Sequence, residues 1–190
     1  LEVLGLICYE AVYAGQEEWN ENYNTTGMNA FIGTFAETAW MLIDRYKDDV
    51  KVFELWNEPS CWSVEPATNP LNPGCFYIWP KCYANLLAET YKTCIEQGGA
   101  DFFTTSGVSL STGGLFAHDI GGGMTTARDY MTQVYAQTSI WNSFQNSPLN
   151  PSGRRYPWDY FGYHFYINQG TAINLTTLAL YFDDIRDLES

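Results

Sequence analysis

Two short segments carry side chains that could perform acid–base chemistry together. In segment 53–59 the order Phe-Glu-Leu-Trp-Asn-Glu-Pro places the carboxamide of Asn57 beside the carboxylate of Glu58 and ends at a proline. In segment 162–166 the order Gly-Tyr-His-Phe-Tyr places His164 and Tyr166 two residues apart, which is the spacing of one strand face. A positioned carboxyl group can donate or accept a proton during a reaction. The two segments predict a site built around Glu58.

The position of Asn57 and Glu58 at the end of an apolar run imposes a condition on the backbone. Neighbouring side chains in a regular strand point to opposite faces. Both residues can face one pocket only if the strand becomes irregular there, and we predict that irregularity. Glu54 precedes Glu58 by four residues, a separation of about 13 Å along a strand. We therefore expect Glu54 to lie too far from Glu58 to be its catalytic partner.

Hydrophobic periodicity predicts four consecutive units of strand and helix that would position these segments. The expected strands are short β-branched or aromatic runs, and the expected helices carry apolar residues at spacings of three and four. The strands are predicted at 3–9, 50–56, 102–108 and 160–167, and the apolar helix stripes at 28–46, 83–95, 131–144 and 178–188. This alternation predicts an α/β fold with parallel strands, each followed by a helix.

Two architectures fit four such units equally well by pattern alone: an open sheet, and half of a closed eight-stranded barrel. No GxGxxG or GxxxxGK[ST] segment follows a predicted strand, which removes the usual nucleotide-binding reason for an open sheet. The predicted strands are about 50 residues apart, so a barrel of eight such units needs about 400 residues, and the 190 residues of this chain would form about half of it. Long loops follow the strands, and both architectures place their functional sites there.

Composition excludes several classes of function. The chain has 190 residues, 46% of them hydrophobic and 17% aromatic, with a formal net charge of −13. That charge repels phosphate backbones, so nucleic acid is not an expected partner. No apolar run approaches the roughly 18 residues of a membrane span. Five cysteines without a CxxC pair and only two histidines predict no metal site.

The cysteines and two Asn-x-Thr sequons favour a secreted glycoprotein. The sequons predict glycosylation at Asn24 and Asn174. We expect a disulfide among Cys61, Cys75 and Cys82, with Cys8 buried and free. The chain also begins within a predicted strand, which suggests that it is a piece of a longer protein.

The Trp-Asn-Glu-Pro string of residues 56–59 resembles the acid/base motif of the large clan of retaining (β/α)8 glycoside hydrolases, which includes family 5 cellulases and mannanases and family 39 xylosidases. In that clan Asn-Glu-Pro closes the fourth strand, and a His-x-Tyr motif like that of His164 and Tyr166 lies on the sixth. The resemblance implies that residues 1–190 form half of a (β/α)8 TIM barrel, a partial catalytic domain with strands and helices three to six.

The resemblance also implies roles for individual residues in a cofactor-free reaction. Retaining hydrolysis uses two carboxyl groups about 5–5.5 Å apart, one to protonate the leaving oxygen and one to attack the anomeric carbon. The resemblance implies that Glu58 is the acid/base residue and that Asn57 hydrogen-bonds the 2-hydroxyl of the sugar. Tyr166 would orient the nucleophile, and His164 would contact the sugar or Glu58.

Aromatic residues near the strand ends are candidates for sugar contacts. Tyr9 ends the first predicted strand, where the clan often has a polar or aromatic contact with the sugar. Trp62 and Trp79, and with less support Trp19, are candidate stacking platforms for pyranose rings, and local packing is the competing interpretation.

The expected function is that of a segment of an O-glycosyl hydrolase acting on a β-linked polysaccharide or oligosaccharide. The clan's nucleophile is a glutamate that ends strand seven, beyond the units found here, so we expect the segment to be inactive alone. Its partners would be the carbohydrate and the remainder of the barrel, from the same precursor or another chain. The alternatives are a non-catalytic, glycosidase-like scaffold of an extracellular assembly and a lectin-like binding module.

Overall fold

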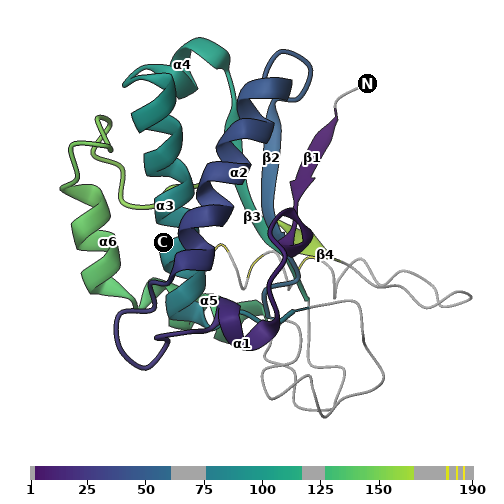
Figure 1. Ribbon diagram of the computed structural model, residues 1–190, viewed down its shortest axis with the longest axis vertical. Coiled ribbons are helices and arrows are strands. Elements are labelled where there is room, and N and C mark those ends of the chain that lie inside the picture. The colour runs from purple at the N-terminus through teal and green to yellow at the C-terminus, as the bar shows by residue number, and fades with distance from the viewer. Residues whose placement is uncertain are drawn as a thin grey trace, which may run out of the picture.

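The computed structural model describes residues 3–60, 76–116 and 127–164, together with residues 179, 183 and 186. Within these residues the chain forms an α/β structure with one four-stranded sheet, all of whose strands are parallel (Figure 1). The strands lie side by side in chain order, as β1 (Leu4–Ile7), β2 (Val52–Asn57), β3 (Ser109–Phe116) and β4 (Tyr163–His164). The predicted α/β class and parallel pairing are confirmed.

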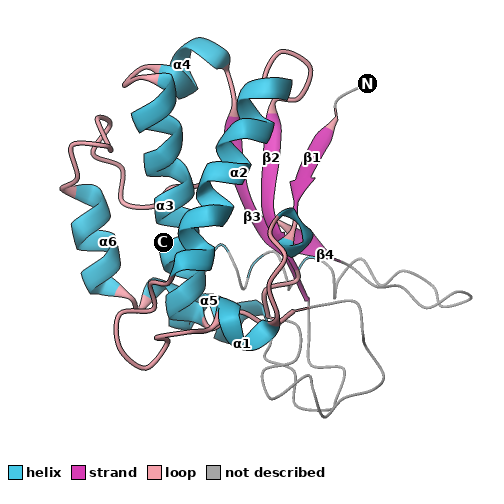
Figure 2. Cartoon of the chain, in the orientation of Figure 1, coloured by secondary structure: helices cyan, strands magenta, loops and turns pink. Residues whose placement is uncertain are grey.

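Helices lie between successive strands of the sheet. In chain order they are η1 (Tyr9–Ala11), α1 (Gln16–Trp19), α2 (Ala30–Tyr46), α3 (Pro80–Gly98), α4 (Phe102–Ser106), α5 (Ala127–Tyr135) and α6 (Thr138–Gln145). The long helices α2 and α3 pack against each other, and Figure 2 shows both on the same side of the sheet. This layer holds β2 and β3 from one face and leaves their carboxyl ends pointing toward α1 and α5.

Local sequence signals define the long helices. The side chain of Asn29 caps α2 by accepting a hydrogen bond from the Ile32 amide at 3.0 Å. The α2 residues that face inward are fully or almost fully buried: Ile32, Phe35, Ala36, Ala39 and Ile43. Helix α3 begins at Pro80, where the missing amide proton costs no hydrogen bond, and ends before Gly99, whose φ of 96° a side chain would disfavour.

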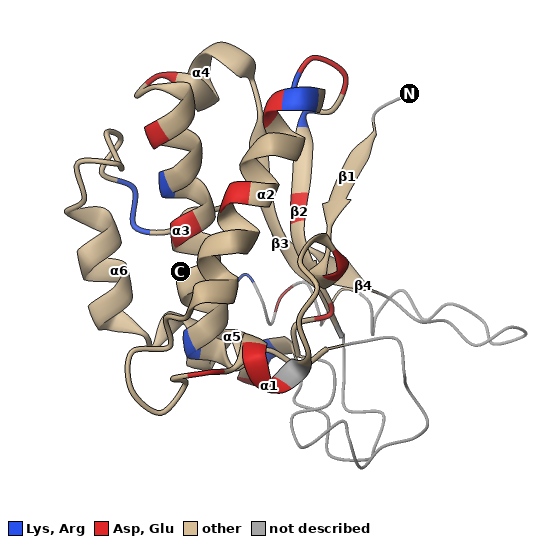
Figure 3. Ribbon diagram, viewed as in Figure 1, with Lys and Arg blue, Asp and Glu red and all other residues tan. Residues whose placement is uncertain are grey.

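The two faces of the sheet differ. Phe53, Leu55 and Leu110 belong to the buried core and are at most 3% exposed. On the alternate positions, Leu6 of β1 is paired with Glu54 of β2, the acidic band within that strand in Figure 3. Leu4 and Leu6 are 55% and 50% exposed, so the described residues leave this part of the sheet uncovered.

The third predicted strand, 102–108, is wrong. Residues Phe102–Ser106 form the short helix α4, whose Thr105 and Ser106 hydroxyls donate to the carbonyls of Asp101 and Phe102. The backbone itself closes the helical turn, with the Thr105 amide donating to the Asp101 carbonyl at 2.9 Å, although the residue types suggest a strand. Gly107, with φ of 69°, then ends the helix, and the strand follows at Ser109–Phe116 in the stretch predicted to be a loop.

The remaining elements follow the predicted order with altered bounds. The stripe at 131–144 is divided between α5 and α6, with a turn in which the Thr138 amide donates to the Ala136 carbonyl. The last predicted strand, 160–167, contributes a single bridge from Tyr160 to Ser111 and then β4, and its residues after 164 lie outside the described part. Residues 179, 183 and 186 are helical, within the last predicted stripe. Every helix of the described ranges is too short or too polar to cross a lipid bilayer.

Candidate active site at the carboxyl ends of the strands

The backbone of β2 leaves regular strand geometry at its carboxyl end. Trp56 has a φ of 79° and Glu58 a φ of 51°, values in the left-handed region that strand residues do not use. The Trp56 indole turns into the core, where its ring centroid lies 4.9 Å from that of Trp19. The irregularity predicted at Asn57 and Glu58 is confirmed, and it places two consecutive polar side chains at the carboxyl end of β2.

A buried hydroxyl spans the gap that this irregularity opens between β2 and β3. The strand register pairs Leu55 with Thr112 and Asn57 with Gly114 but omits Trp56. The Tyr83 hydroxyl of α3 donates to the Leu55 carbonyl at 2.9 Å and accepts from the Gly113 amide at 2.7 Å. Because Tyr83 supplies these two bonds, the distorted strand end leaves neither backbone group unpaired.

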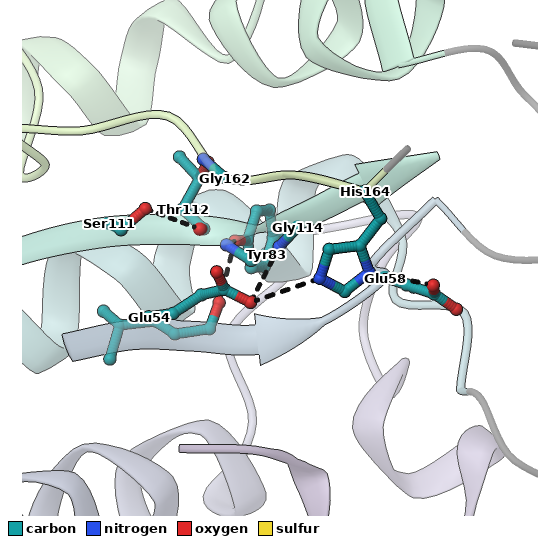
Figure 4. Close-up of polar contacts among 10 residues, drawn as sticks. Glu54, Glu58, Tyr83, Ser111, Thr112, Gly114, Gly162 and His164 are labelled. Atoms are coloured by element: carbon teal, nitrogen blue, oxygen red, sulfur yellow. Dashed lines mark hydrogen bonds and ion pairs between the residues drawn. The ribbon is translucent and has the colours of Figure 1, made fainter. Parts of the chain in front are cut away.

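Glu58 meets His164 at the centre of the site. Its side chain is 7% exposed, and its Oε1 lies 2.9 Å from Nδ1 of His164, which comes from β4 (Figure 4). The predicted proximity of the two motifs therefore holds for Glu58 and His164. Tyr166, the third residue of this prediction, lies outside the described residues.

A second carboxylate reaches the same imidazole from the opposite side. Oε1 of Glu54 lies 3.9 Å from Nε2 of His164 and accepts a hydrogen bond of 3.1 Å from the Gly114 amide of β3. Figure 4 shows the His164 ring between Glu54 and Glu58. His164 thus connects two glutamates four residues apart, Glu54 within β2 and Glu58 just after its end.

Two consecutive glycines in β3 make room for this arrangement. A Cβ atom on Gly113 would lie 2.5 Å from the Trp56 carbonyl oxygen, and one on Gly114 would overlap the His164 ring. The imidazole therefore occupies the space that a side chain at position 114 would take. Here the Gly-Gly pair is a requirement of close packing inside a strand.

The electrostatics of the three groups favour protonation of the imidazole. The hydrogen bond to Glu58 raises the pKa of His164 above its ordinary value, and the charges of Glu58 and Glu54 act in the same direction against the opposing effect of burial. Burial also raises the pKa of Glu54, while the Gly114 amide and the charge of His164 oppose that shift. The two flanking carboxyl groups therefore favour the protonated form of His164.

Tyr9 and Asn57 form the other side of the site. Tyr9 was expected to end a strand, but β1 stops at Ile7 and Tyr9 begins the short helix η1. Its ring packs edge-on against Trp56, with centroids 5.4 Å apart. Burial raises the pKa of the Tyr9 hydroxyl, and a hydrogen bond with the Asn57 side chain opposes the shift. Tyr9 therefore joins the candidate site from a different element than predicted.

The candidate stacking residues have different fates. Trp19 is fully buried, with its ring against Trp56 and Phe35, so it is a core residue. Trp79 precedes α3 and stacks on Tyr23, with centroids 4.6 Å apart and planes 7° from parallel. One of its faces is thereby covered by protein. Trp62 lies outside the described residues.

The cysteine and sequon predictions are tested in part. Cys8, Cys82 and Cys94 are free thiols, and burial raises the pKa of Cys82 to about 12. A bridge that includes Cys82 is therefore wrong, because its buried thiol points to the Glu21 carbonyl oxygen, 3.9 Å away. Cys8 is free as expected but only half-buried. The remaining candidates for a bridge, Cys61 and Cys75, lie outside the described residues.

Asn24 is exposed in the turn between α1 and α2, and the second sequon, at Asn174, also lies outside the described part.

Sequence reasoning missed two contributors to the site. Glu54 was set aside on its distance from Glu58 along the strand, a criterion that ignores a third side chain lying between them. The sequence signal for its role was a charged residue inside a predicted strand, because a buried charged residue is rarely found without a partner. Tyr83 was assigned to the apolar stripe of a helix, and nothing in that pattern indicates the two backbone hydrogen bonds made by its hydroxyl.

The described residues include no group of three or more His, Cys, Asp or Glu side chains arranged to hold a metal ion. The sequence matches no protein-family model, and comparisons with curated proteins and with solved structures found no match. The chemistry of the site is therefore inferred from its own residues and geometry.

Proposed function

We propose that this chain belongs to a retaining glycoside hydrolase in which Glu58 is the acid/base residue. The observation that carries the proposal is the buried Glu58 carboxyl group at the end of a parallel strand, beside Asn57 and 2.9 Å from His164. A carboxyl group held in this way can protonate the leaving oxygen of a glycoside and later deprotonate water.

The topology supports the finer proposal of half a (β/α)8 barrel. The strands follow one another in chain order, whereas a doubly wound sheet reverses its strand order at a switch point. The long helices α2 and α3 lie on the same side of the sheet, as they do outside a barrel (Figure 1). The exposed Leu4 and Leu6 would then face the barrel interior, which side chains of the remaining strands fill.

The proposed reaction assigns a task to each side chain at the edge. Glu58 donates its proton to the glycosidic oxygen as the bond breaks, and Asn57 hydrogen-bonds the sugar 2-hydroxyl, a contact that strengthens in the transition state. Tyr9, bonded to Asn57, fixes the orientation of that carboxamide. The nucleophilic carboxylate belongs to strand seven of the same barrel, outside these four units, so that this segment alone does not complete the reaction.

The substrate class follows from the resemblance of the motifs and from charge. The acidic chain and the aromatic residues around the site suit a neutral, β-linked polysaccharide or oligosaccharide. The exposed sequon at Asn24 agrees with a secreted glycoprotein. No cofactor takes part in the proposed reaction.

The test follows the anomeric proton by NMR while the full-length protein acts on β-linked gluco-, manno- and xylo-oligosaccharides. A retaining enzyme releases the β-anomer first, because two displacements occur at the anomeric carbon. Initial release of the α-anomer would contradict the retaining mechanism. Sugar binding without hydrolysis of any of the three series would contradict the enzyme and support the scaffold alternative.

A further inference from the structure

Glu54 is a buried acidic side chain for which the proposed reaction has no task. It lies inside β2, is 6% exposed, and faces the side of the sheet opposite the helix-covered core. Burial of a carboxylate is costly unless the group is paired and hydrogen-bonded. The Gly114 amide and the His164 ring are the partners that offset this cost, at 3.1 and 3.9 Å.

The geometry of His164 distinguishes between its protonation states. Neutral imidazole has one donor and one acceptor nitrogen, whereas imidazolium donates from both. In the structure each ring nitrogen faces a glutamate oxygen, Nδ1 that of Glu58 and Nε2 that of Glu54. Nδ1 is at hydrogen-bond distance from Glu58, and Nε2 is within ion-pair distance of Glu54. The Glu54 carboxylate on the far side of the ring favours the doubly protonated form by its charge.

We propose that Glu54 is a positioning residue that keeps His164 protonated, so that the imidazolium holds Oε1 of Glu58 and leaves the transferable proton on Oε2. The inference rests on the proposed acid/base role of Glu58 and adds a residue to it. Glu54 does not touch the substrate in this arrangement, because it acts through the imidazole.

Loss of the imidazolium proton should slow the reaction. Once His164 is neutral, Nδ1 can accept the proton of Glu58, which then points away from the leaving oxygen. Protonation of the glycoside slows, although the carboxyl group itself is still present. The alkaline limb of the activity profile should therefore report the titration of His164.

Other titratable groups surround the pair and bear on the same equilibrium. Among the described residues, two phenols also lie near the glutamates. Besides burial, the charge of Glu54 raises the pKa of Tyr83 from α3, and the charge of Glu58 raises the pKa of Tyr9 from η1. Burial raises the pKa of both phenols, so they stay neutral while His164 titrates. Glu54 is therefore the negative charge that stabilises the imidazolium while Glu58 carries its proton.

The experiment titrates His164 by NMR in the substrate-free, full-length protein, with its signal assigned by its loss in His164→Gln. The wild-type pKa is expected above the ordinary value of about 6.5. Glu54→Gln keeps the shape of the side chain and removes its charge, so the pKa of His164 should fall toward that ordinary value. Glu37→Gln, on the exposed face of α2, removes the same charge and should leave the pKa within about 0.2 units, since solvent screens it.

The alkaline limb of kcat/KM should move with His164 in Glu54→Gln, and Glu54→Asp, which restores the charge, should recover most of the shift. An unchanged His164 titration in folded Glu54→Gln overturns the inference. If that variant does not fold, a wild-type pKa at or below about 6.5 overturns it equally. Because the titration needs no substrate, its result is independent of whether Glu58 proves catalytic.

Discussion

Nδ1 of His164 lies 2.9 Å from Oε1 of Glu58, although 106 residues separate them in the chain. The contact forms because parallel strands bring their carboxyl ends to the same end of the sheet, with β3 lying between β2 and β4. This contact joins the two motifs on which the functional prediction rests. Substitutions at Glu58 and at His164 can test the two motifs separately.

Replacing Glu58 by glutamine removes the proposed proton donor with little change of shape. The kcat/KM for unactivated oligosaccharides should fall by about 10²- to 10⁴-fold, whereas activated aryl glycosides, whose leaving groups need no proton in the first step, should retain most of their kcat/KM. Steady-state kinetics on the two substrate classes measure the difference, with Glu37→Gln as the control. An equal loss on both classes would argue against acid/base duty.

Replacing Tyr83 by phenylalanine should destabilise the fold. The change removes the hydroxyl that bonds the Leu55 carbonyl and the Gly113 amide, and both groups are buried. We expect a loss of about 1–3 kcal/mol in the free energy of unfolding, measured by urea denaturation. The matched control is Tyr46→Phe, because Tyr46 is 47% exposed and should tolerate the change. Equal stability of the two variants would mean that the bridging hydroxyl is dispensable.

Adding one methyl group at position 114 should displace the imidazole from between the glutamates. A Cβ atom there overlaps His164, so Gly114→Ala should lower the pKa of His164 and reduce activity at least tenfold. Gly33→Ala, in the first turn of α2 where an added Cβ meets no other atom within 4 Å, should instead stabilise the protein by about 0.5–1 kcal/mol. NMR titration and thermal unfolding follow the two effects, and an unperturbed His164 in Gly114→Ala would refute this packing constraint.

Stability should decrease as the pH rises through the titration of His164. The folded state raises the pKa of this imidazole, so it binds more protons than the unfolded state between the ordinary value of about 6.5 and the raised one. The stabilisation is fully present below that window and is lost above it. Glu54, whose pKa is also raised by burial, acts with the same sign at lower pH. Thermal unfolding across pH 5–9 should show a shallower decline above about pH 6 in His164→Gln, and an unchanged slope would exclude this linkage.

Glycosylation at Asn24 can be tested in a secretory expression host. The Asn24 side chain is exposed in the turn before α2, so Asn24→Gln should remove one glycan and increase electrophoretic mobility. Thr26→Ala should have the same effect because it destroys the sequon. Thr25→Ala, at the unconstrained middle position, is the matched control. Identical mobility of Asn24→Gln and the wild type before and after deglycosylation would show that the site is unused.

The sequence predicted what periodicity and motif chemistry control. The order of strands and helices, the break in β2 at Asn57 and Glu58, and the proximity of His164 all follow from local patterns and parallel topology. Residues Phe102–Ser106 were misassigned because strand-forming residue types occur there in a short helix that ends at the left-handed Gly107. Glu54 and Tyr83 were missed because their roles depend on third residues that no spacing rule identifies.

The exposed leucines of β1 have a practical consequence for the handling of this polypeptide. Among the described strands β1 has a single neighbour, so one side of its backbone presents amide and carbonyl groups beside Leu4 and Leu6. Such an edge readily recruits another extended chain. Preparations that lack whatever normally shields it should precipitate or form oligomers as concentration increases, and charged substitutions at these two leucines should restore solubility.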